Sequence, residues 1–350
     1  MALEGSGDEA LSLELARAIV GGLGEAELCR RMGTRDPEAA CHDLTRSLRR
    51  DMSGTLNELR VKLTTPTRAV PTRRTRRGRK AISFIKWVGS KTSVLKELRP
   101  LLPARFNCYY EPMVGSGTLF FSTAPRRAVL CDLNGELMHC YRVLRDRCPE
   151  LVKALALHEN SEEHFLEVRA QEPGELEPVA RAARTIYLNK TCFNGLYRVN
   201  SGGRFNVPFG RIWWANVCDQ ETLARTSEQL RGVRLLNGDY ARALETAGAG
   251  DLVYLDPPYL SSGKGPATFY AYQPHTFGEE EHQRLAQLFR ELDRRGCHLM
   301  LSNADTEQVR ALYDGFPNKV LTTRRPVNCK AGKREGWREL IIHNRREGTE

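Results

Sequence analysis

The stretch that decides the fold is Tyr110-Glu111-Pro112-Met113-Val114-Gly115-Ser116-Gly117-Thr118-Leu119, in which a Gly-x-Gly turn joins a strand-like run to a helical one. Glycine has no Cβ, so Gly115 and Gly117 allow the backbone to approach a ligand closely. In open α/β sheets such a turn lies at the carboxyl end of a strand, where cofactors bind. The stretch predicts a cofactor loop, although a tight turn that only requires glycine explains these residues equally well.

Strand-like and helical runs alternate on both sides of this loop. We expect strands at residues 107–112, 128–132, 233–236, 252–256 and 298–302. We expect helices at residues 92–101, 137–145, 181–188 and 279–295. This alternation is typical of a parallel sheet covered by helices. The predicted fold class is therefore α/β, with a mainly parallel central sheet.

The second expected strand ends in Leu130-Cys131-Asp132-Leu133-Asn134. A carboxylate at this place, Asp132, can accept hydrogen bonds from the hydroxyls of a ribose. The third glycine of a dinucleotide fingerprint is missing after Gly117, which argues against NAD. The sequence therefore predicts a nucleoside cofactor of another kind.

The composition favours a polyanionic partner. The chain has 350 residues, a net charge of +10 and a pI near 9.2. Nucleic acid is the first candidate for such a partner, although a solvated basic face gives the same excess. None of the 10 cysteines forms a C-x-x-C pair, so neither a metal site nor a disulfide framework is expected. No apolar run approaches the roughly 18 residues of a membrane span, so we expect a soluble, cytoplasmic protein.

The chain divides by composition into three parts. Residues 1–63 contain three short helical patterns, which predict a small helical module, either a helix-turn-helix or a helical adaptor with a basic face. Residues 64–80 have no apolar periodicity and carry Arg or Lys at six positions from 73 to 80, which indicates a basic linker. The α/β pattern occupies residues 81–344.

The run Leu252-Val253-Tyr254-Leu255-Asp256-Pro257-Pro258-Tyr259 is an apolar strand that stops in a carboxylate, two prolines and an aromatic. The Asp256 carboxylate and the Pro257 carbonyl can accept hydrogen bonds from the two N–H groups of an exocyclic amine, which makes this poor nucleophile more reactive. The prolines stiffen the loop, and Tyr259 offers a face for stacking a base. The other interpretation is an edge strand that ends in a proline-rich turn.

With these motifs the sequence resembles the Dam-type DNA adenine methyltransferases, the class alpha family with a D-P-P-Y motif. The resemblance covers residues 83–344 and rests on motifs in the family's order: Phe84–Lys91, the Gly-x-Gly loop, Tyr187–Gly210 and Asp256–Tyr259. It implies a Rossmann-like methyltransferase domain. It also implies an inserted helical target-recognition domain at about residues 137–232.

The resemblance further implies S-adenosyl-L-methionine as the cofactor. Its binding residues would be Trp87, Lys91, Glu111, Gly115, Gly117, Asp132, Asp239, Tyr240 and Asp256. Asp132 would contact the ribose and Asp239 with Tyr240 the adenine edge. The catalytic residues would be Asp256, Pro257, Pro258 and Tyr259. The looser match 301–305 would support the catalytic loop from the end of a strand.

In the family the middle block reads double-stranded DNA, commonly at GATC. The residues that match its pattern are Lys86, Asn194, Leu196, Arg198 and Pro208. Arg198 would read a guanine edge, with a phosphate contact as the alternative, while Leu196 and Pro208 would pack against a thymine methyl. The sequence departs from the family at Ile212, where an aromatic is common, and this leaves the outermost guanine open.

The expected function is site-specific methylation of adenine N6 in DNA by base flipping and direct methyl transfer. Methylation of cytosine N4 poses the same chemical problem and is one alternative, although that family more often carries serine at the position of Asp256. A DNA-binding regulator without activity is the other. We expect a monomer in solution, and a partner restriction endonuclease is left open.

Overall fold

The computed structural model describes residues 83–212, 215–260, 277–323 and 337–345. The chain divides into two compact units, Met1–Gly78 and Arg79–Glu350. The first unit lies outside the described residues, and so do the expected helical module at 1–63 and the basic linker at 64–80.

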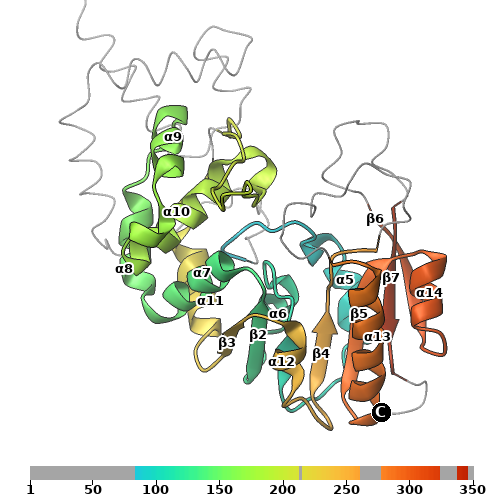
Figure 1. The fold of residues 1–350 in the computed structure, drawn as a ribbon. Helices are drawn as coiled ribbons and strands as arrows, with labels where there is room; N and C mark the ends of the chain where they lie inside the picture. Colours follow the sequence, from blue (N-terminus) through green and yellow to red (C-terminus); the bar gives the residue numbers. More distant parts are fainter. Residues whose placement is uncertain (1–82, 213–214, 261–276, 324–336, 346–350) are drawn as a thin grey trace, which may run out of the picture. The chain divides into compact units, whose positions relative to one another are not determined.

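The described residues of the second unit contain a seven-stranded sheet in the order β3-β2-β1-β4-β5-β7-β6 (Figure 1). The strands are β1 (Tyr109–Glu111), β2 (Ala128–Asp132), β3 (Arg234–Asn237), β4 (Leu252–Leu255), β5 (His298–Ala304), β6 (Asn318–Thr323) and β7 (Trp337–His343). β1 to β5 are parallel, and β7 is antiparallel to β5 and β6. The expected Rossmann-like α/β fold with a mainly parallel sheet is confirmed. β6 and β7 were not expected from the sequence.

Helices cover both faces of this sheet, and further helices lie beyond its β3 end (Figure 1). They are α5 (Leu95–Leu98), α6 (Thr118–Thr123), α7 (Gly135–Asp146), α8 (Cys148–Ala156), α9 (Glu162–Ala170), α10 (Pro178–Thr191), α11 (Gln220–Gln229), α12 (Tyr240–Leu244), α13 (Glu279–Arg294) and α14 (Glu307–Leu312). The segment between β2 and β3, where a recognition insertion was predicted, contains α7 to α11. In Figure 1, α8, α9 and α10 lie beyond the β3 end of the sheet.

One expected helix, at residues 92–101, is broken. The chain there forms two short 3-10 turns, η1 (Lys91–Ser93) and η2 (Arg99–Leu101), on either side of the one-turn helix α5. Pro100 lacks a backbone N–H, which explains why the α-helix does not continue through this position. Lys91 lies in the first of the two 3-10 turns, where its side chain is buried.

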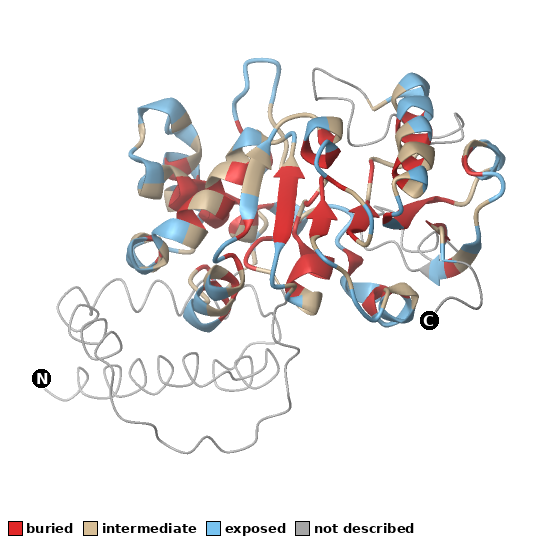
Figure 2. Cartoon of the chain, turned by 90° about the horizontal axis from the view of Figure 1, so that it is seen from below, coloured by how far each residue is buried: buried red, intermediate tan, exposed pale blue. Residues whose placement is uncertain are grey.

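The central strands are buried on both faces because their residues alternate between two apolar cores. Leu252 and Tyr254 of β4 belong to one core, and Val253 and Leu255 belong to the other. This period of two is the geometry of a strand, and a parallel sheet that is covered on both sides needs apolar residues on both faces. In Figure 2 the central strands are buried, and the helices expose their outer faces. The alternation turns the next residue, Asp256, toward the core that contains the chain around Lys91.

The strand order reverses between β1 and β4, which are parallel neighbours. In open α/β sheets a crevice forms at this switch point, outside the carboxyl ends of the strands. The Gly-x-Gly loop follows β1 and the Asp-Pro-Pro-Tyr loop follows β4. The topology thus brings the two motifs to one edge of the sheet.

Candidate active site

An ion pair between a buried lysine and a half-buried aspartate lies at the centre of this edge. The Lys91 Nζ is 2.8 Å from the Asp256 Oδ2, and the exposed fractions of the two side chains are 7% and 20%. Lys91 also donates to the Gly89 carbonyl at 2.8 Å, which orients the ammonium within its own turn. Lys91, predicted at the cofactor or substrate pocket, therefore contacts the predicted catalytic carboxylate directly.

A second carboxylate, Glu339 on β7, shares this ammonium. Its Oε1 lies 3.6 Å from the Lys91 Nζ, and the Tyr259 hydroxyl donates a hydrogen bond to the same oxygen. The Lys91 Nζ also lies 5.1 Å from the centre of the Tyr259 ring, within cation–π range. Sequence reasoning missed Glu339. No local pattern singles it out, since it follows Arg338 at the start of a strand far along the chain.

The environment of Asp256 changes its acidity. Burial raises the pKa of Asp256 to about 6, while the nearby Lys91 opposes the rise and Glu339 adds to it. Such a carboxyl is still ionised at neutral pH, but it is a stronger base than an ordinary aspartate.

The catalytic loop is attached to the end of β5. The Asn303 Oδ1 accepts hydrogen bonds from the backbone N–H groups of Leu260, at 3.2 Å, and Ala304, at 2.8 Å. The hydroxyl groups of Tyr254 and Ser302 are 2.8 Å apart in the buried layer beneath. The expected support of the loop by residues 301–305 thus has a specific contact. Pro257 is buried, and Pro258 is half-buried.

The glycines of the cofactor loop are required by its geometry. Gly115 and Gly117 have φ angles of +48° and +63°, and a Cβ at Gly115 would lie 2.9 Å from the Trp87 Cδ1. The Gly115 N–H donates to the Asp132 Oδ2 at 3.0 Å, and the Tyr141 hydroxyl donates to the Gly115 carbonyl at 3.0 Å. The structure thus brings together Trp87, the loop and Asp132.

Glu111 ends β1 and Asp132 ends β2, and the two carboxyl groups have different hydrogen-bond partners. The Asp132 Oδ1 accepts the Asn134 N–H at 2.9 Å, so both carboxylate oxygens of Asp132 already bind backbone donors. Glu111 is 3% exposed and accepts from the Tyr109 hydroxyl at 2.8 Å and the Phe120 N–H at 3.3 Å. Burial raises the pKa of Glu111 to about 8, so this carboxyl is mostly protonated at neutral pH.

Asp239 and Tyr240 follow β3 and are held by α13. Asp239 accepts the Ala241 N–H at 2.9 Å and forms a two-pronged ion pair with Arg284, with both contacts at 2.8 Å. The Arg284 hydrogen bonds keep the pKa of Asp239 below its ordinary value. Arg284 also lies over the Tyr240 ring at 4.8 Å, and the Tyr240 hydroxyl donates to Glu281 at 3.1 Å. Sequence reasoning found the first two residues and missed Arg284 and Glu281.

The chemistry of this edge fits a cationic nucleoside. The ends of four parallel strands carry the acidic residues Glu111, Asp132, Asp239 and Asp256. Beside them lie a glycine loop in which a Cβ has no room and the aromatic residues Trp87 and Tyr240. The carboxylates of the three aspartates suit ribose hydroxyls and a positive charge, and aromatic faces suit a base.

The Lys-Trp motif is joined to the middle block by Asn189 on α10. The Asn189 amide accepts from the Lys86 N–H at 2.9 Å and donates to the Lys86 carbonyl at 2.8 Å and the Gly195 carbonyl at 3.0 Å. The Trp87 ring stacks on the Tyr197 ring with centroids 5.3 Å apart. The cofactor loop and the middle block therefore both contact Trp87.

The predicted DNA-contacting residues differ in exposure. Asn194 and Pro208 are exposed, and the Lys86 side chain is exposed and donates to the Lys190 carbonyl at 3.4 Å. Arg198 is held by Asn206, through the side-chain oxygen at 2.7 Å and the backbone carbonyl at 3.1 Å.

Leu196 requires a correction. It was predicted to pack against a thymine methyl, but it is 4% exposed and belongs to the apolar core. Its buried position gives it a packing role, because a residue enclosed by the core has no surface to offer to a DNA groove. Ile212, whose carbonyl accepts from Asn160 at 2.8 Å, is half-buried.

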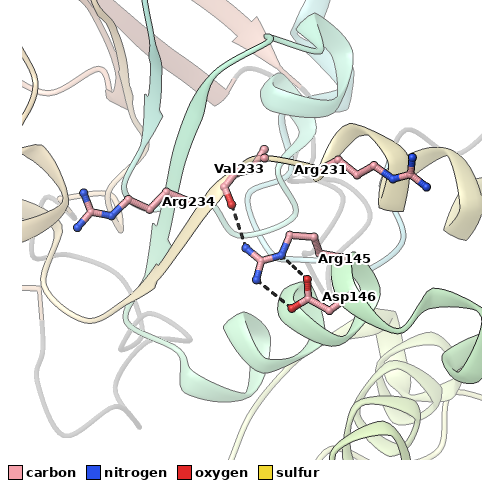
Figure 3. Close-up of a pocket in the computed structure, with 6 residues that line it drawn as sticks. Arg145, Asp146, Arg231, Val233 and Arg234 are labelled. Carbon is pink, nitrogen blue, oxygen red and sulfur yellow. Dashed lines mark hydrogen bonds and ion pairs between the residues drawn. The ribbon is translucent and has the colours of Figure 1, made fainter.

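An arginine-lined hollow of about 420 Å³ lies elsewhere, at the amino end of β3 (Figure 3). Arg145 is paired with Asp146 at 2.7 and 2.9 Å and donates to the Val233 carbonyl at 2.9 Å. In Figure 3 the side chains of Arg231 and Arg234 point away in opposite directions. Because its polar groups do not converge, this hollow is not a candidate active site. Among the described helices, none is long and apolar enough to cross a membrane.

Comparison with known proteins assigns the family. Residues 87–326 match the family described as D12 class N6 adenine-specific DNA methyltransferase. The chain belongs to this family, and it is an adenine-specific DNA methyltransferase with DNA as its substrate. The resemblance found in the sequence is confirmed.

Particular relatives agree. The Type II methyltransferase M1.LlaDCHI of Lactococcus lactis subsp. cremoris is 37% identical over 269 residues, which cover 75% of this chain and 94% of the relative. The Type II methyltransferase M.MjaIII of Methanocaldococcus jannaschii is 36% identical over 284 residues, with coverages of 75% and 98%. The DNA adenine methylase of Escherichia coli K12 is 32% identical over 263 residues, with coverages of 74% and 94%.

Proposed function

We propose that this protein uses S-adenosylmethionine to methylate adenine N6 within GATC or a close relative of that site, after flipping the base out of the duplex. The observation that carries the proposal is the position of Asp256. It lies at the switch point of the sheet, paired with a buried lysine, on the edge where the acidic strand ends gather. In open α/β sheets ligands bind at such an edge, which gives a nucleoside cofactor and a flipped base a place to meet.

The residues of the chain orient the nucleophile. The Asp256 carboxylate accepts a hydrogen bond from one N6 N–H and the Pro257 carbonyl accepts one from the other, which draws the lone pair out of the ring toward the methyl donor. When bound, S-adenosylmethionine supplies a methyl group on a positively charged sulfur. With a pKa of about 6, Asp256 is ionised at neutral pH and is basic enough to take the proton that N6 loses. Most of the rate enhancement comes from positioning and fixed charge.

The cofactor is assigned to the groups on the carboxyl edge. Asp132 and Glu111 end the strands that flank the glycine loop, and Trp87 packs against Gly115. Asp239 and Tyr240, fixed by Arg284, face the adenine. Gly117 completes the tight turn. Lys91 contributes through Asp256, with which it is paired, and through its charge.

The flipped base stacks on Tyr259. Its ring is held under the Lys91 ammonium and its hydroxyl is bound by Glu339, so its face has a fixed orientation. Pro257 and Pro258 keep the loop rigid between the Asp256 carboxylate and the Tyr259 ring. Removing a base from the duplex costs a few kcal/mol, which a ready stacking surface offsets in part.

The DNA site is read by the exposed part of the middle block. Arg198 is the guanine reader, and its contacts with Asn206 hold the guanidinium in one orientation before DNA binds. Asn194, Pro208 and Lys86 are exposed and make the remaining contacts. Leu196 supports this block from the core.

The test is to map the modified bases in DNA from cells that express the chain. Expression of the wild type should place N6-methyladenine at one short motif, and expression of Asp256→Ala should place none. Modification of cytosine N4 would overturn the proposal, and so would the absence of any modified base. Purified protein with tritiated S-adenosylmethionine and duplex oligonucleotides would identify the methyl donor independently.

A further inference from the structure

Glu339 is an ionisable residue inside the sheet. On β7 it pairs with Ala304 of β5 on one side and with Leu321 of β6 on the other, and it is 6% exposed. Because β7 runs antiparallel to β5, its first residues lie at the carboxyl edge of the parallel strands. This direction brings a side chain from the end of the sequence to the catalytic loop.

The contacts of Glu339 all lead to the active site. Its Oε1 accepts a hydrogen bond from the Tyr259 hydroxyl and lies 3.6 Å from the Lys91 Nζ. Lys91 is in turn 2.8 Å from Asp256. One ammonium is therefore shared by two carboxylates, and one of these also binds the hydroxyl of the stacking residue.

The fold itself has no need of a carboxylate here. Residues 340 to 342, which follow in β7, are buried and apolar. A buried charge is costly even when it is paired, and replacing such pairs by apolar residues is often neutral or stabilising. Since Glu339 contacts two groups of the active site, its charge serves the reaction better than it serves the sheet.

We propose that Glu339 is a positioning residue for methyl transfer, which fixes the Tyr259 ring through its hydroxyl and holds the Lys91 ammonium between two carboxylates beside the amino group to be methylated. This inference rests on the proposed function of the same site. It assigns to Glu339 two separable actions, one through a hydrogen bond and one through charge.

The charge of Glu339 acts on Asp256. Glu339 raises the pKa of Asp256, whereas Lys91 lowers it. The other charged or titratable groups that act on Asp256 or are acted on by it are Glu111 and Tyr109 of β1, Tyr254 of β4 and Tyr259 of the loop. Neutralising Glu339 should therefore lower the pKa of Asp256 and move the acidic limb of the pH–rate profile to lower pH.

The experiment compares Glu339→Gln with Tyr259→Phe in the full chain. Glutamine keeps the shape and an acceptor for the Tyr259 hydroxyl but loses the charge, so kcat should fall at least about tenfold and the acidic limb should move to lower pH. Phenylalanine removes only the hydroxyl that Glu339 binds, so kcat/KM for DNA should fall. The acidic limb of the pH–rate profile should stay at the pH of the wild type. Glu339→Asp keeps the charge on a shorter side chain. Its acidic limb should lie at the pH of the wild type, while its kcat should stay below that of the wild type.

The control is Glu228→Gln, an exposed glutamate of α11 that is paired with Arg231; it should match the wild type. The proposal is overturned if folded Glu339→Gln has a kcat within about twofold of the wild type and an unmoved limb. If Glu339→Gln does not fold, Glu339→Asp decides: wild-type kcat in that variant overturns the proposal. Wild-type protein that transfers no methyl group would instead refute the proposed function itself.

Discussion

The ammonium of Lys91 lies 2.8 Å from a carboxylate oxygen of Asp256, in a pocket that exposes little of either side chain. Lys91 precedes the first strand of the sheet and Asp256 follows the fourth, so the contact exists only when the sheet is assembled. A lysine at this distance stabilises the ionised carboxylate against the effect of burial. The Lys91–Asp256 pair therefore connects methyl-transfer activity with the pKa of Asp256 and with the stability of the fold.

Asp256→Ala should abolish methyl transfer while the protein remains folded. The substitution removes both the acceptor that orients N6 and the base that takes its proton, so kcat should fall at least about 100-fold. Single-turnover transfer of a labelled methyl group to duplex DNA measures the loss, and circular dichroism checks the fold. Turnover within about tenfold of the wild type would show that another group is catalytic.

Lys91→Met should shift the acidic limb of the pH–rate profile to higher pH. Lys91 lowers the pKa of Asp256, so its removal leaves a higher pKa and a carboxylate that ionises only at higher pH. The shift is opposite in sign to the one expected for Glu339→Gln. Because one partner of a buried pair is lost, the free energy of unfolding should also fall by about 3 kcal/mol. An unchanged limb would mean that the ion pair does not form in the working enzyme.

Glu111→Gln should remove part of the pH dependence of stability. The folded pKa of Glu111 is about 8 and its ordinary value is 4.5, so the folded state holds a proton that the unfolded state releases. The stability from this proton is fully present below pH 4.5 and is lost as the pH rises through 8. Chemical denaturation of the cofactor-free protein between pH 5 and 9 should give a flatter curve for the variant. Parallel curves would mean that Glu111 is ionised in the folded protein.

S-adenosylmethionine should raise the melting temperature of the wild type, since it binds only the folded state; at 100 times Kd it contributes about 2.7 kcal/mol. Gly115→Ala should lose this shift, because a Cβ there lies 2.9 Å from Trp87 on a backbone with positive φ. The matched control is Gly174→Ala, where a Cβ meets nothing within 4 Å. A shift by NAD and none by S-adenosylmethionine would refute the cofactor.

Arg198→Ala should lose discrimination at one guanine more than general affinity for DNA. Two hydrogen bonds to a guanine edge are worth about 1 to 3 kcal/mol at that base. Arg204→Ala, at an exposed arginine of the same block, is the control and should weaken binding equally on all sequences, if at all. Methylation of a library of single-base variants of the site measures both. A uniform loss for Arg198→Ala, with a shallower salt dependence, would assign it to a phosphate.

The sequence alone determined the parallel part of the fold and the order of the motifs. β1 to β5 lie where strand-like runs predicted them, and the signal is strongest in β2 and β4, because a strand buried on both faces needs apolar residues on both. Asp256, Gly115 and Asp132 could be predicted because each follows or ends an apolar strand. A polar residue or glycine at that place interrupts the apolar pattern and marks a functional position. The helix at residues 92–101 was wrong in detail because tertiary packing and Pro100 override helical periodicity.

Only the tertiary structure decided which residues act on one another. Glu339 reaches Lys91 and Tyr259 because β7 is inserted antiparallel between β5 and β6, and no local pattern specifies that pairing. Arg284 engages Asp239, and Leu196 is enclosed by the core, for the same kind of reason. Local sequence fixes the period and the ends of an element, whereas burial, ion pairing and pKa depend on neighbours that are distant in the chain and close in space.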